Sequence, residues 1–398
     1  MRRVAVTGAG AVSALGVDLA SFWNGLKAGR PGIGPIRAVD CSTFKFSQGA
    51  EVPGFDPLRY FDEKTAGQLD RSVQFAGAAA AEAIADSGIV LVPDRTAVVT
   101  GCALGGKPTE DDTYRQLYAD GRTRFDPMSI PKVMTNASAS RVSMHHGITG
   151  PCYTVSTACA SAAHAIGQAF WMVRSGLVDA AVTGGTEAPV TLGMLRAWEA
   201  MRVVAPDTCR PFSRDRRGLI LGEGAAFLVL EDMDAALARG ARVHAEICGL
   251  GMSSDAGHLT APSADGAARA MTAALRDAGL DAGQVGYVNA HGTGTPANDA
   301  TETRAIRAVF AVPPLVSSTK SMHGHALGAS PALEAVATVL ALRDGVLPPT
   351  ANFTEPDPAC DLDVIPNQAR QVQVEAALSN SFAFGGLNAV LAFRRHAG

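Results

Sequence analysis

The 398-residue sequence has few charged side chains and no excess of basic ones. Charged residues make up 18% of the chain against 47% hydrophobic residues, and the formal net charge is −4. A composition this apolar predicts a packed globular protein and argues against intrinsic disorder. A slightly acidic protein also lacks the broad basic surface of nucleic-acid-binding proteins, so an acidic partner would have to meet a local basic patch.

Paired cysteines and long apolar runs are also missing. The seven cysteines are scattered and contain no Cys-x-x-Cys pair, which argues against a zinc site and a disulfide framework. No uninterrupted apolar run approaches the roughly 20 residues that a membrane span needs. Glycines interrupt the N-terminus, so Val4–Thr7 is expected to form a first strand rather than part of a signal peptide. We therefore expect reduced thiols and a cytoplasmic protein.

No low-complexity linker divides the chain, and short β-branched segments alternate with Ala-rich segments throughout. This alternation predicts a layered α/β architecture in which at least part of each sheet is parallel. Strands are expected at 3–7, 96–100, 180–183, 225–231, 243–250, 286–290, 315–318, 376–380 and 388–393. Helices are expected at 18–28, 72–87, 159–175, 232–239, 265–279, 299–309 and 330–343.

Two segments resemble each other, one in each half of the chain. Residues 155–167 and 316–328 both run from a strand through a Ser/Thr turn into a helix of small residues. The similarity indicates either a duplicated α/β domain or two units that agree by chance. A duplication would place both turns near a pseudo-twofold axis, where residues far apart in sequence meet in one site.

Cys159 stands at the start of the expected helix 159–175, directly after a strand and a turn. Unpaired N–H groups and the positive end of a helix dipole favour the thiolate, which is the nucleophilic form. A buried structural cysteine is the alternative, because free cysteines are often found in protein cores.

Three further segments place reactive side chains at strand ends. Segment 287–299 ends its strand at His291 and continues into a Gly/Thr loop. Segment 317–328 carries Lys320 and two histidines after a strand, and 378–388 is a polar, glycine-containing turn between two strands. Each signal is weak alone. Because active sites of α/β folds gather at strand ends, the four segments together predict one site.

The motifs of these segments resemble those of the elongating, type II β-ketoacyl-acyl-carrier-protein synthases of the thiolase-like superfamily. The similarity covers essentially the full length and fits both the housekeeping and the nodulation-type specialised branches. The motifs that carry it are Thr-Ala-Cys-Ala-Ser at 157–161, Asn-Ala-His-Gly-Thr-Gly-Thr at 289–295, Ser-Thr-Lys-Ser at 318–321, Gly-His-Ala-Leu-Gly-Ala at 324–329, and shorter matches at Arg210-Pro-Phe, Gly222-Glu-Gly-Ala and Asn380-Ser-Phe.

The resemblance implies a fold and a division of the chain. The fold is a thiolase-like, duplicated, five-layered αβαβα architecture of the α/β class. The N-terminal half, residues 1–240, would carry the nucleophilic cysteine. The C-terminal half, residues 241–398, would carry the catalytic histidine pair and the lysine.

The resemblance also implies a decarboxylative Claisen condensation and assigns its residues. Cys159 would take the acyl group from a carrier thioester, with the backbone amides of Cys159 and Phe384 stabilising the oxyanion. His291 and His325 would donate Nε2–H hydrogen bonds to the enolate that forms when the malonyl thioester loses CO2.

The remaining basic residues near these motifs are assigned differently. Lys320 matches the family's active-site lysine and would act electrostatically, while a buried ion pair with Glu334 is the alternative or additional role. His323 and His164 are expected to have packing roles rather than catalytic ones.

Several residues match substrate-binding positions. Thr293 and Thr295 resemble the pair that hydrogen-bonds the phosphopantetheine arm, with a plain structural turn as the alternative. Leu104, Trp198 and Phe382 are placed at the acyl pocket. Because Leu104 is branched and Trp198 is larger than the usual Phe, we expect a preference for medium-length acyl chains, with ordinary core packing as the alternative.

No cofactor is expected to be required, since phosphopantetheine arrives on the carrier protein. Four residues match positions that hold a monovalent cation in some relatives, so a structural Na⁺ or K⁺ is a candidate. A plain hydrogen-bond network is the alternative. These residues are Asn289, Glu334, Ser379 and Asn380.

The expected partners are an acidic acyl carrier protein, loaded with acyl or malonyl groups, and a second copy in a homodimer. Lys64, Arg124 and Arg202 match basic docking positions of the family. Gly67 and Gln68 stand where a basic pair is common, which indicates a weaker or different carrier. Nearby arginines that would compensate are Arg59 and Arg71.

The last turn departs from the family pattern, with Ala383 and Leu387 where Gly and Thr are usual. Ala383 is expected to stiffen the loop and restrict the motion of Phe384. Two other functions compete with the condensing enzyme. One is a non-catalytic chain-length-factor-like partner, which lacks the nucleophile, and the other is a biosynthetic thiolase or initiating synthase, which uses a different catalytic set.

Overall fold

The computed structural model describes residues 1–396 and leaves out 397–398, at the end of the predicted C-terminal half. Its main sheet contains β1 (Val4–Val12), β4 (Thr96–Gly101), β5 (Cys152–Val155), β6 (Ala180–Glu187), β7 (Gly224–Asp232), β8 (Ala245–Ser254), β9 (Val285–Asn289), β10 (Leu315–Ser317), β13 (Ala376–Ala383) and β14 (Leu387–Arg394). Small two-stranded sheets pair β2 (Gly34–Pro35) with β3 (Gln48–Gly49) and β11 (Val346–Leu347) with β12 (Arg370–Gln371).

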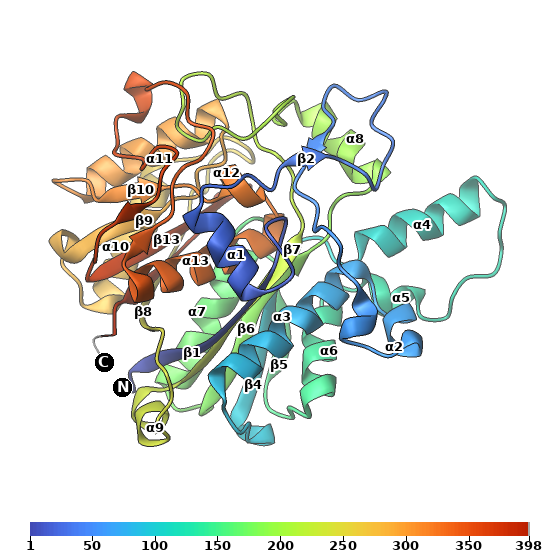
Figure 1. The fold of residues 1–398 in the computed structure, drawn as a ribbon, viewed down its shortest axis with the longest axis horizontal. Helices are drawn as coiled ribbons and strands as arrows, with labels where there is room; N and C mark the ends of the chain where they lie inside the picture. Colours follow the sequence, from blue (N-terminus) through green and yellow to red (C-terminus); the bar gives the residue numbers. More distant parts are fainter. Residues whose placement is uncertain (397–398) are drawn as a thin grey trace.

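The helices surround and separate the two halves of this sheet (Figure 1). They are α1 (Leu19–Lys27), α2 (Glu63–Gly67), α3 (Arg71–Ser87), α4 (Lys107–Tyr118), α5 (Ser129–Val133), α6 (Ala137–His146), α7 (Ser161–Arg174), α8 (Leu192–Met201), α9 (Met233–Ala238), α10 (Ala264–Ala278), α11 (Pro296–Val309), α12 (Lys320–His323) and α13 (Ser330–Asp344).

The strand order shows an internal repeat. The sheet runs β10-β9-β13-β14-β8-β1-β7-β6-β4-β5, and β1 and β8 pair antiparallel at its centre. Outward from β1 the next pairings are antiparallel, antiparallel, parallel and parallel, and the same series runs outward from β8. The two similar segments therefore occupy equivalent places, because each starts on an outermost strand, β5 or β10. The duplication predicted from the sequence is confirmed.

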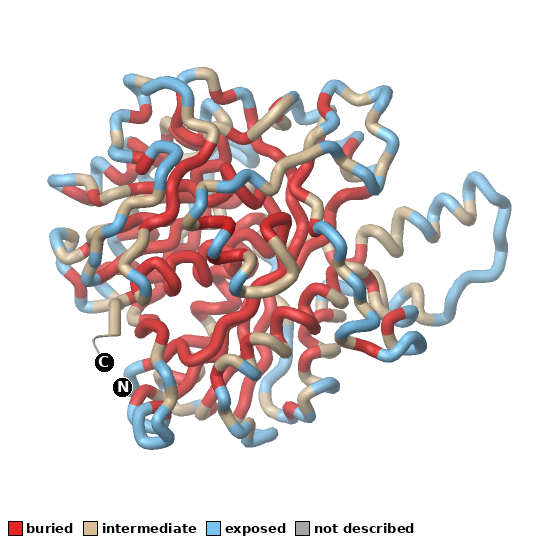
Figure 2. Tube along the Cα trace, viewed as in Figure 1, coloured by how far each residue is buried: buried red, intermediate tan, exposed pale blue. Residues whose placement is uncertain are grey.

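Three apolar clusters define the layers. The largest contains α7 and α13 between the two half-sheets, a second packs α10 and α11 on one outer face, and a third packs α3 and α6 on the other. Every residue of α13 from Ser330 to Leu342 is buried, as expected for a helix with sheet on both sides (Figure 2). The predicted five-layered αβαβα architecture is confirmed. The predicted boundary near residue 240 lies between α9 and β8 and stays a prediction.

Glycines in β1 and β4 allow helices to approach the sheet closely. A Cβ at Gly8 or Gly10 would lie 2.1 Å from a carbonyl oxygen of α3, and one at Gly101 would lie 2.2 Å from the backbone nitrogen of Ala162 in α7. The glycines near the N-terminus therefore belong to β1, a buried strand that packs against α3. The close contact at Gly101 also brings the start of α7, with Cys159 just before it, directly against the sheet.

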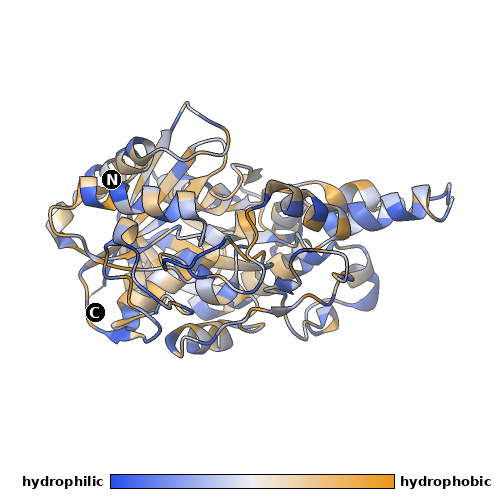
Figure 3. Ribbon diagram, turned by 90° about the horizontal axis from the view of Figure 1, so that it is seen from above, coloured by the Kyte–Doolittle hydropathy of each residue, from blue (hydrophilic) through white to orange (hydrophobic). Residues whose placement is uncertain are grey.

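All nine predicted strands and seven predicted helices are present, with ends shifted by up to a few residues. The strand expected just before Cys159 is β5, and the elements absent from the prediction include α4, α6 and α8. Helix α4 has no buried residue and projects from the body, so it has no apolar stripe by which to recognise it (Figure 3). Among the described residues, no helix combines the length and the apolar character that crossing a membrane would require.

Candidate active site

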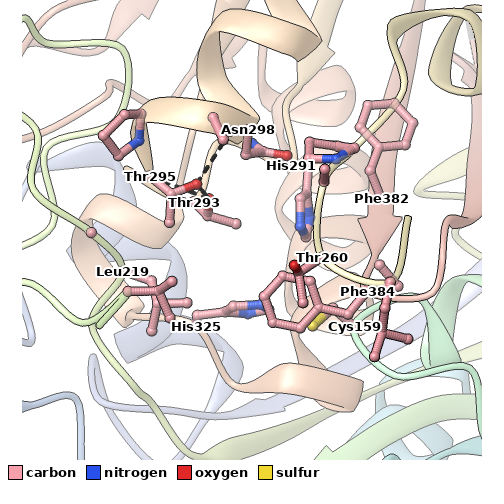
Figure 4. A pocket seen from close by; sticks show the side chains of 18 of the residues that line it. Cys159, Leu219, Thr260, His291, Thr293, Thr295, Asn298, His325, Phe382 and Phe384 are labelled. Atoms are coloured by element: carbon pink, nitrogen blue, oxygen red, sulfur yellow. Dashed lines mark hydrogen bonds between the residues drawn. The ribbon is translucent and has the colours of Figure 1, made fainter. Parts of the chain in front are cut away.

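A cavity of about 310 Å³ lies where the segments predicted to carry chemistry converge (Figure 4). Helix α7 supplies one wall through the turn before it, β9 and the loop after it supply another, and the β13–β14 turn covers the nucleophile. The predicted site residues that line the cavity are Cys159, His291, Thr293, Thr295, His325, Trp198, Phe382, Phe384 and Arg202.

Cys159 sits on a tight, strained turn between β5 and α7. Ala158 has φ 49°, a left-handed conformation that non-glycine residues rarely adopt and that is typical of functional turns. The Ser161 hydroxyl closes this turn, because it donates to the Ala158 carbonyl at 2.7 Å and accepts from the Thr157 N–H at 2.9 Å. The turn thus points the Cys159 sulfur into the cavity.

The environment of Cys159 differs from the expectation of a thiolate at a helix end. Burial raises the pKa of the thiol to about 12, and it outweighs the lowering by the Lys320 charge and by the backbone N–H of Phe384. Helix α7 begins at Ser161, two residues after the cysteine, so the sulfur is not in its first turn. The resting site therefore holds the thiol form, and the Lys320 and Phe384 contacts are what favour the thiolate.

His291 and His325 face each other across the cavity. Their ring centroids are 5.6 Å apart and the rings are nearly perpendicular. Burial, with the nearby Lys320 charge, holds the pKa of both imidazoles well below 6.5. Both rings are therefore neutral at pH 7, and each carries a single N–H donor.

A residue that sequence reasoning missed, Glu302 of α11, holds the loop of His291. Its carboxylate accepts hydrogen bonds from the backbone N–H groups of His291 and Gly292, both at 2.8 Å, and from the Asn380 amide at 3.1 Å. Burial raises the pKa of Glu302. The sequence signal that could have identified Glu302 is its acidic side chain on the buried face of α11.

Lys320 combines both of its predicted roles. Its ammonium forms a buried ion pair with Glu334, donates to the His291 carbonyl at 2.7 Å, and lies 3.4 Å from His291 Nδ1. An ammonium has only donors, so it presents a proton to Nδ1 and leaves the His291 proton on Nε2. Burial raises the pKa of Glu334 to about 7.

The two histidines expected to be structural lie outside the cavity lining. His323 is fully buried, with Nε2 3.0 Å from the Thr319 hydroxyl and its ring beside Phe22. His164 hydrogen-bonds within its own segment, through Nδ1 to the Thr157 hydroxyl at 2.9 Å and to the Ala160 carbonyl at 3.1 Å. Their contacts fit packing roles.

Phe384 lies in the turn between β13 and β14, and its ring stacks against Trp198 with centroids 6.2 Å apart. Gly385 and Gly386 have φ 86° and 69°, so the turn needs glycine at both positions. Ala383 is not in this loop, because it ends β13 and pairs with Leu387 at the start of β14. The expectation was therefore wrong in placing Ala383 in the loop, and the predicted restriction of Phe384 stays a prediction.

Thr293 and Thr295 line the cavity with their hydroxyls 2.9 Å apart. Thr295 also caps α11, where its hydroxyl accepts from the Asn298 N–H at 3.3 Å. Thr295 therefore has a structural duty besides facing the cavity. Phe382 packs edge-on against the His291 ring, with centroids 6.1 Å apart.

The four candidate cation ligands are all buried, on two paired strands and on α13. Asn289 and Ser379 are register partners on β9 and β13. Asn380 follows Ser379 on β13, so its side chain points to the other face of the sheet, where its amide contacts Met271 and Glu302. Among the described residues, Asn289 Oδ1 and Nδ2, Glu334 Oε2 and Asn380 Oδ1 have no hydrogen-bond partner. The cation site, like the hydrogen-bond network that is its alternative, stays a prediction.

The structure does not bring the other predicted site residues to the cavity. Leu104 is half-buried, packs against the central core and donates its N–H to Glu187 at 3.1 Å, but does not line the cavity. Lys64 in α2 and Arg124 in the loop after α4 are exposed and lie apart from it.

Arg71 does not replace the missing basic pair. Its guanidinium is bound to the buried Glu223 carboxylate at 2.6 Å and stacks on Phe75. Arg59 is exposed. A basic side chain that sequence reasoning missed, Arg217, does line the cavity with Arg202, as does the segment 258–262.

Family models and solved structures agree with this geometry. Residues 1–236 match the model "Beta-ketoacyl synthase, N-terminal domain", and residues 244–354 match "Beta-ketoacyl synthase, C-terminal domain". Nodulation protein E of Rhizobium meliloti is 47% identical over 99% of both chains. A 3-oxoacyl-[acyl-carrier-protein] synthase 2 of Synechocystis is 43% identical over 99% of this chain and 98% of that protein.

Two solved structures are similar over their whole length. The ishigamide ketosynthase/chain length factor has a TM-score of 0.95 and 39% identity, with all of both chains covered. A β-ketoacyl synthase from Burkholderia phymatum has a TM-score of 0.93 and 36% identity, also with full coverage.

Proposed function

The chain belongs to the β-ketoacyl synthase family, and from this premise we propose that its cavity condenses a Cys159-bound acyl group with malonyl-acyl carrier protein to give 3-oxoacyl-acyl carrier protein. The observation that carries the proposal is the meeting of one nucleophilic thiol with two neutral imidazoles in a single cavity. The reaction has two steps with different needs: acyl transfer needs a nucleophile, and decarboxylation needs donors that stabilise the enolate. The thiol suits the first step and the imidazoles suit the second.

In the first half-reaction the Cys159 sulfur attacks the carbonyl of the acyl thioester. The charge that develops on the carbonyl oxygen is proposed to be held by the N–H groups of Cys159 and Phe384, and the Phe384 N–H contacts the Cys159 sulfur in the resting site. The bond to the carrier sulfur then breaks, and the carrier thiol leaves with the proton that Cys159 loses.

In the second half-reaction a malonyl thioester occupies the same cavity. Its thioester oxygen accepts the Nε2–H groups of His291 and His325, and CO2 leaves as negative charge develops on that oxygen. Neutral donors are suited to this step, because they stabilise the enolate without bringing a charge into a poorly solvated site. The enolate carbon attacks the acyl-Cys159 carbonyl, a carbon–carbon bond forms, and the Cys159 sulfur is released and reprotonated.

The competing functions fit the cavity less well. A structural relative is described as a ketosynthase/chain length factor, but a non-catalytic subunit has no use for Cys159 on a strained turn. Thiolases and initiating synthases use a different catalytic set, and here two histidines share the cavity with one cysteine.

We propose that the acidic carrier protein docks over the cavity mouth. Arg202 and Arg217 line it and are largely exposed, so they can meet acidic side chains as the phosphopantetheine arm enters past Thr293 and Thr295. Lys64 and Arg124 are proposed as outlying contacts. We also propose a homodimer that forms through the edge of β5, to be measured by sedimentation. A cytoplasmic location is proposed as well, to be measured by cell fractionation.

The function is tested with purified protein, acyl-acyl carrier protein and malonyl-acyl carrier protein. We expect 3-oxoacyl-carrier product and CO2 in equal amounts, with the acyl group trapped on Cys159 when the malonyl substrate is omitted. Product formation with acyl-CoA but not with acyl-carrier protein would favour an initiating synthase. If the protein alone gives no acylation and no product, the chain-length-factor-like alternative would be favoured.

The acyl chain length is proposed to be set by Trp198, whose ring closes the cavity against Phe384. We expect Trp198→Ala to shift kcat/KM toward long acyl chains by about tenfold relative to medium ones, because one filled apolar pocket discriminates by roughly that factor. Competition assays across acyl lengths measure the shift. Trp171→Ala, outside the cavity lining, is the control, and equal preferences in wild type and Trp198→Ala would contradict the assignment.

We also propose a bound Na⁺ or K⁺ among Asn289, Glu334, Ser379 and Asn380. Because such an ion would bind only the folded protein, NaCl or KCl should raise the thermal midpoint by a few degrees, on the order of 1 kcal/mol of linkage, over choline chloride at equal ionic strength. Identical midpoints in all three salts would contradict the site.

A further inference from the structure

Ser330 is a buried hydroxyl in contact with His325. Its Oγ lies 2.9 Å from His325 Nδ1, and both side chains are almost completely inaccessible to solvent. Ser330 begins α13, and the motif that identified His325 ends just before it. We infer that Ser330 is a positioning residue that fixes His325 in the tautomer with its proton on Nε2. The inference rests on the proposed function, because it specifies how one of its histidines is prepared.

The direction of this hydrogen bond follows from what each group can do. Within residues 1–396, the hydrogen-bond partner of the Ser330 hydroxyl is Nδ1 of His325. If Nδ1 carried the proton, it would donate to Oγ and leave the hydroxyl hydrogen buried without an acceptor, which is unfavourable. If the hydroxyl donates to Nδ1, its hydrogen is satisfied and the imidazole proton must be on Nε2.

The backbone holds both groups in place, so the bond is built into the fold. The His325 N–H donates to the Ile220 carbonyl at 2.7 Å, and the His325 carbonyl accepts from the Gly222 N–H at 3.0 Å. Pro331 follows Ser330 in the first turn of α13 and fixes the local backbone. Because the backbone of both residues is already fixed, only their side-chain torsions have to be ordered when they pair.

The two cavity histidines are thus prepared by different groups. The Lys320 ammonium faces Nδ1 of His291 at 3.4 Å, and the Ser330 hydroxyl faces Nδ1 of His325. In both cases the second ring nitrogen keeps the proton, and the rings lie on the cavity side (Figure 4). Two Nε2–H donors therefore converge on the place where the enolate oxygen forms.

This arrangement separates the half-reactions. The oxyanion of acyl transfer is held by the amides of Cys159 and Phe384, whereas the enolate is held by the histidines. Loss of the Ser330 hydroxyl lets His325 populate the Nδ1–H tautomer, which cannot donate into the cavity. Decarboxylation and condensation should slow, while acylation of Cys159 should not.

The test compares Ser330→Ala with wild type and with Thr338→Val. Thr338 lies on the same helix, is equally buried and hydrogen-bonds the Glu334 backbone carbonyl at 2.7 Å, so it controls for loss of any buried hydroxyl of α13. We expect decarboxylation of malonyl-acyl carrier protein and condensation to fall roughly tenfold in Ser330→Ala, the factor of one hydrogen bond. Acylation of Cys159, followed by intact mass, should stay within about twofold.

A spectroscopic measurement reads the tautomer directly. In protein with ¹⁵N-labelled histidine, long-range proton–nitrogen correlations should show a protonated Nε2 for His325 in wild type and a mixture in Ser330→Ala. Equal losses in both half-reactions, no loss in either, or an unchanged tautomer would overturn the inference. Failure of the proposed function would appear separately, as absence of condensation by the wild-type protein.

Discussion

Replacement of Cys159 by serine is expected to remove the acyl-enzyme and to lower condensation by on the order of 10⁴-fold or more, as for loss of a covalent nucleophile. Serine preserves the shape of the side chain, so the strained turn at Ala158 and the packing of α7 should survive. A serine hydroxyl is a far weaker nucleophile than a thiol. The neutral imidazoles are proposed to donate to the enolate oxygen, so they would not remove the proton of the serine hydroxyl.

Two measurements separate this result from general damage. Intact mass after incubation with acyl-acyl carrier protein should show one added acyl group in wild type and none in Cys159→Ser. Cys248→Ser is the matched control, since Cys248 is a part-buried thiol on β8 that hydrogen-bonds the Ala392 carbonyl and lies outside the cavity. Acyl transfer in Cys159→Ser, or its loss in Cys248→Ser, would contradict the nucleophile assignment.

The thiol's environment adds a pH dependence to the same experiment. Because burial raises the pKa of Cys159 to about 12, its alkylation in the resting enzyme should be slow at pH 7 and should speed up steadily toward pH 10. A thiol alkylated at full rate at pH 7 would show instead that Lys320 and the Phe384 N–H outweigh burial.

The sequence was sufficient to predict the layered fold because its strongest patterns are local. Buried strands such as β4 and β9 appear as short β-branched runs, and α10 shows clear helical periodicity. The helices α4 and α5 lack these patterns, because neither has a buried residue. Their places depend on the rest of the fold rather than on their own residues.

The site residues that belong to a motif could be predicted from the sequence. Residues that act through contacts with distant parts of the sequence could not. Cys159, His291 and His325 come from motifs, and the cavity unites them. The carboxylate of Glu302 acts through three hydrogen bonds and the hydroxyl of Ser330 through one, and no sequence spacing reveals these contacts. The raised pKa of Cys159 likewise follows from burial by distant segments.

Removal of the Lys320 charge is expected to have the second large effect, on stability and on catalysis together. Lys320 and Glu334 are both fully buried and form an ion pair, so Lys320→Ala leaves a carboxylate without its partner. Breaking one side of such a pair costs about 3–5 kcal/mol of unfolding free energy. His291 Nδ1 also loses its donor, and condensation should fall by about 100-fold, as when one oxyanion donor is lost.

A double variant separates these two effects. Lys320→Met with Glu334→Gln removes both charges at similar volume, so most of the lost stability should return, because neutral replacement of a buried pair is often nearly neutral. Condensation should stay low, since methionine has no proton to present to His291 Nδ1 and the imidazole proton is no longer held on Nε2. Urea unfolding and the decarboxylation assay measure the two quantities independently. Recovery of condensation together with stability would show that Lys320 acts only through the fold, and the ammonium would then have no part in preparing His291.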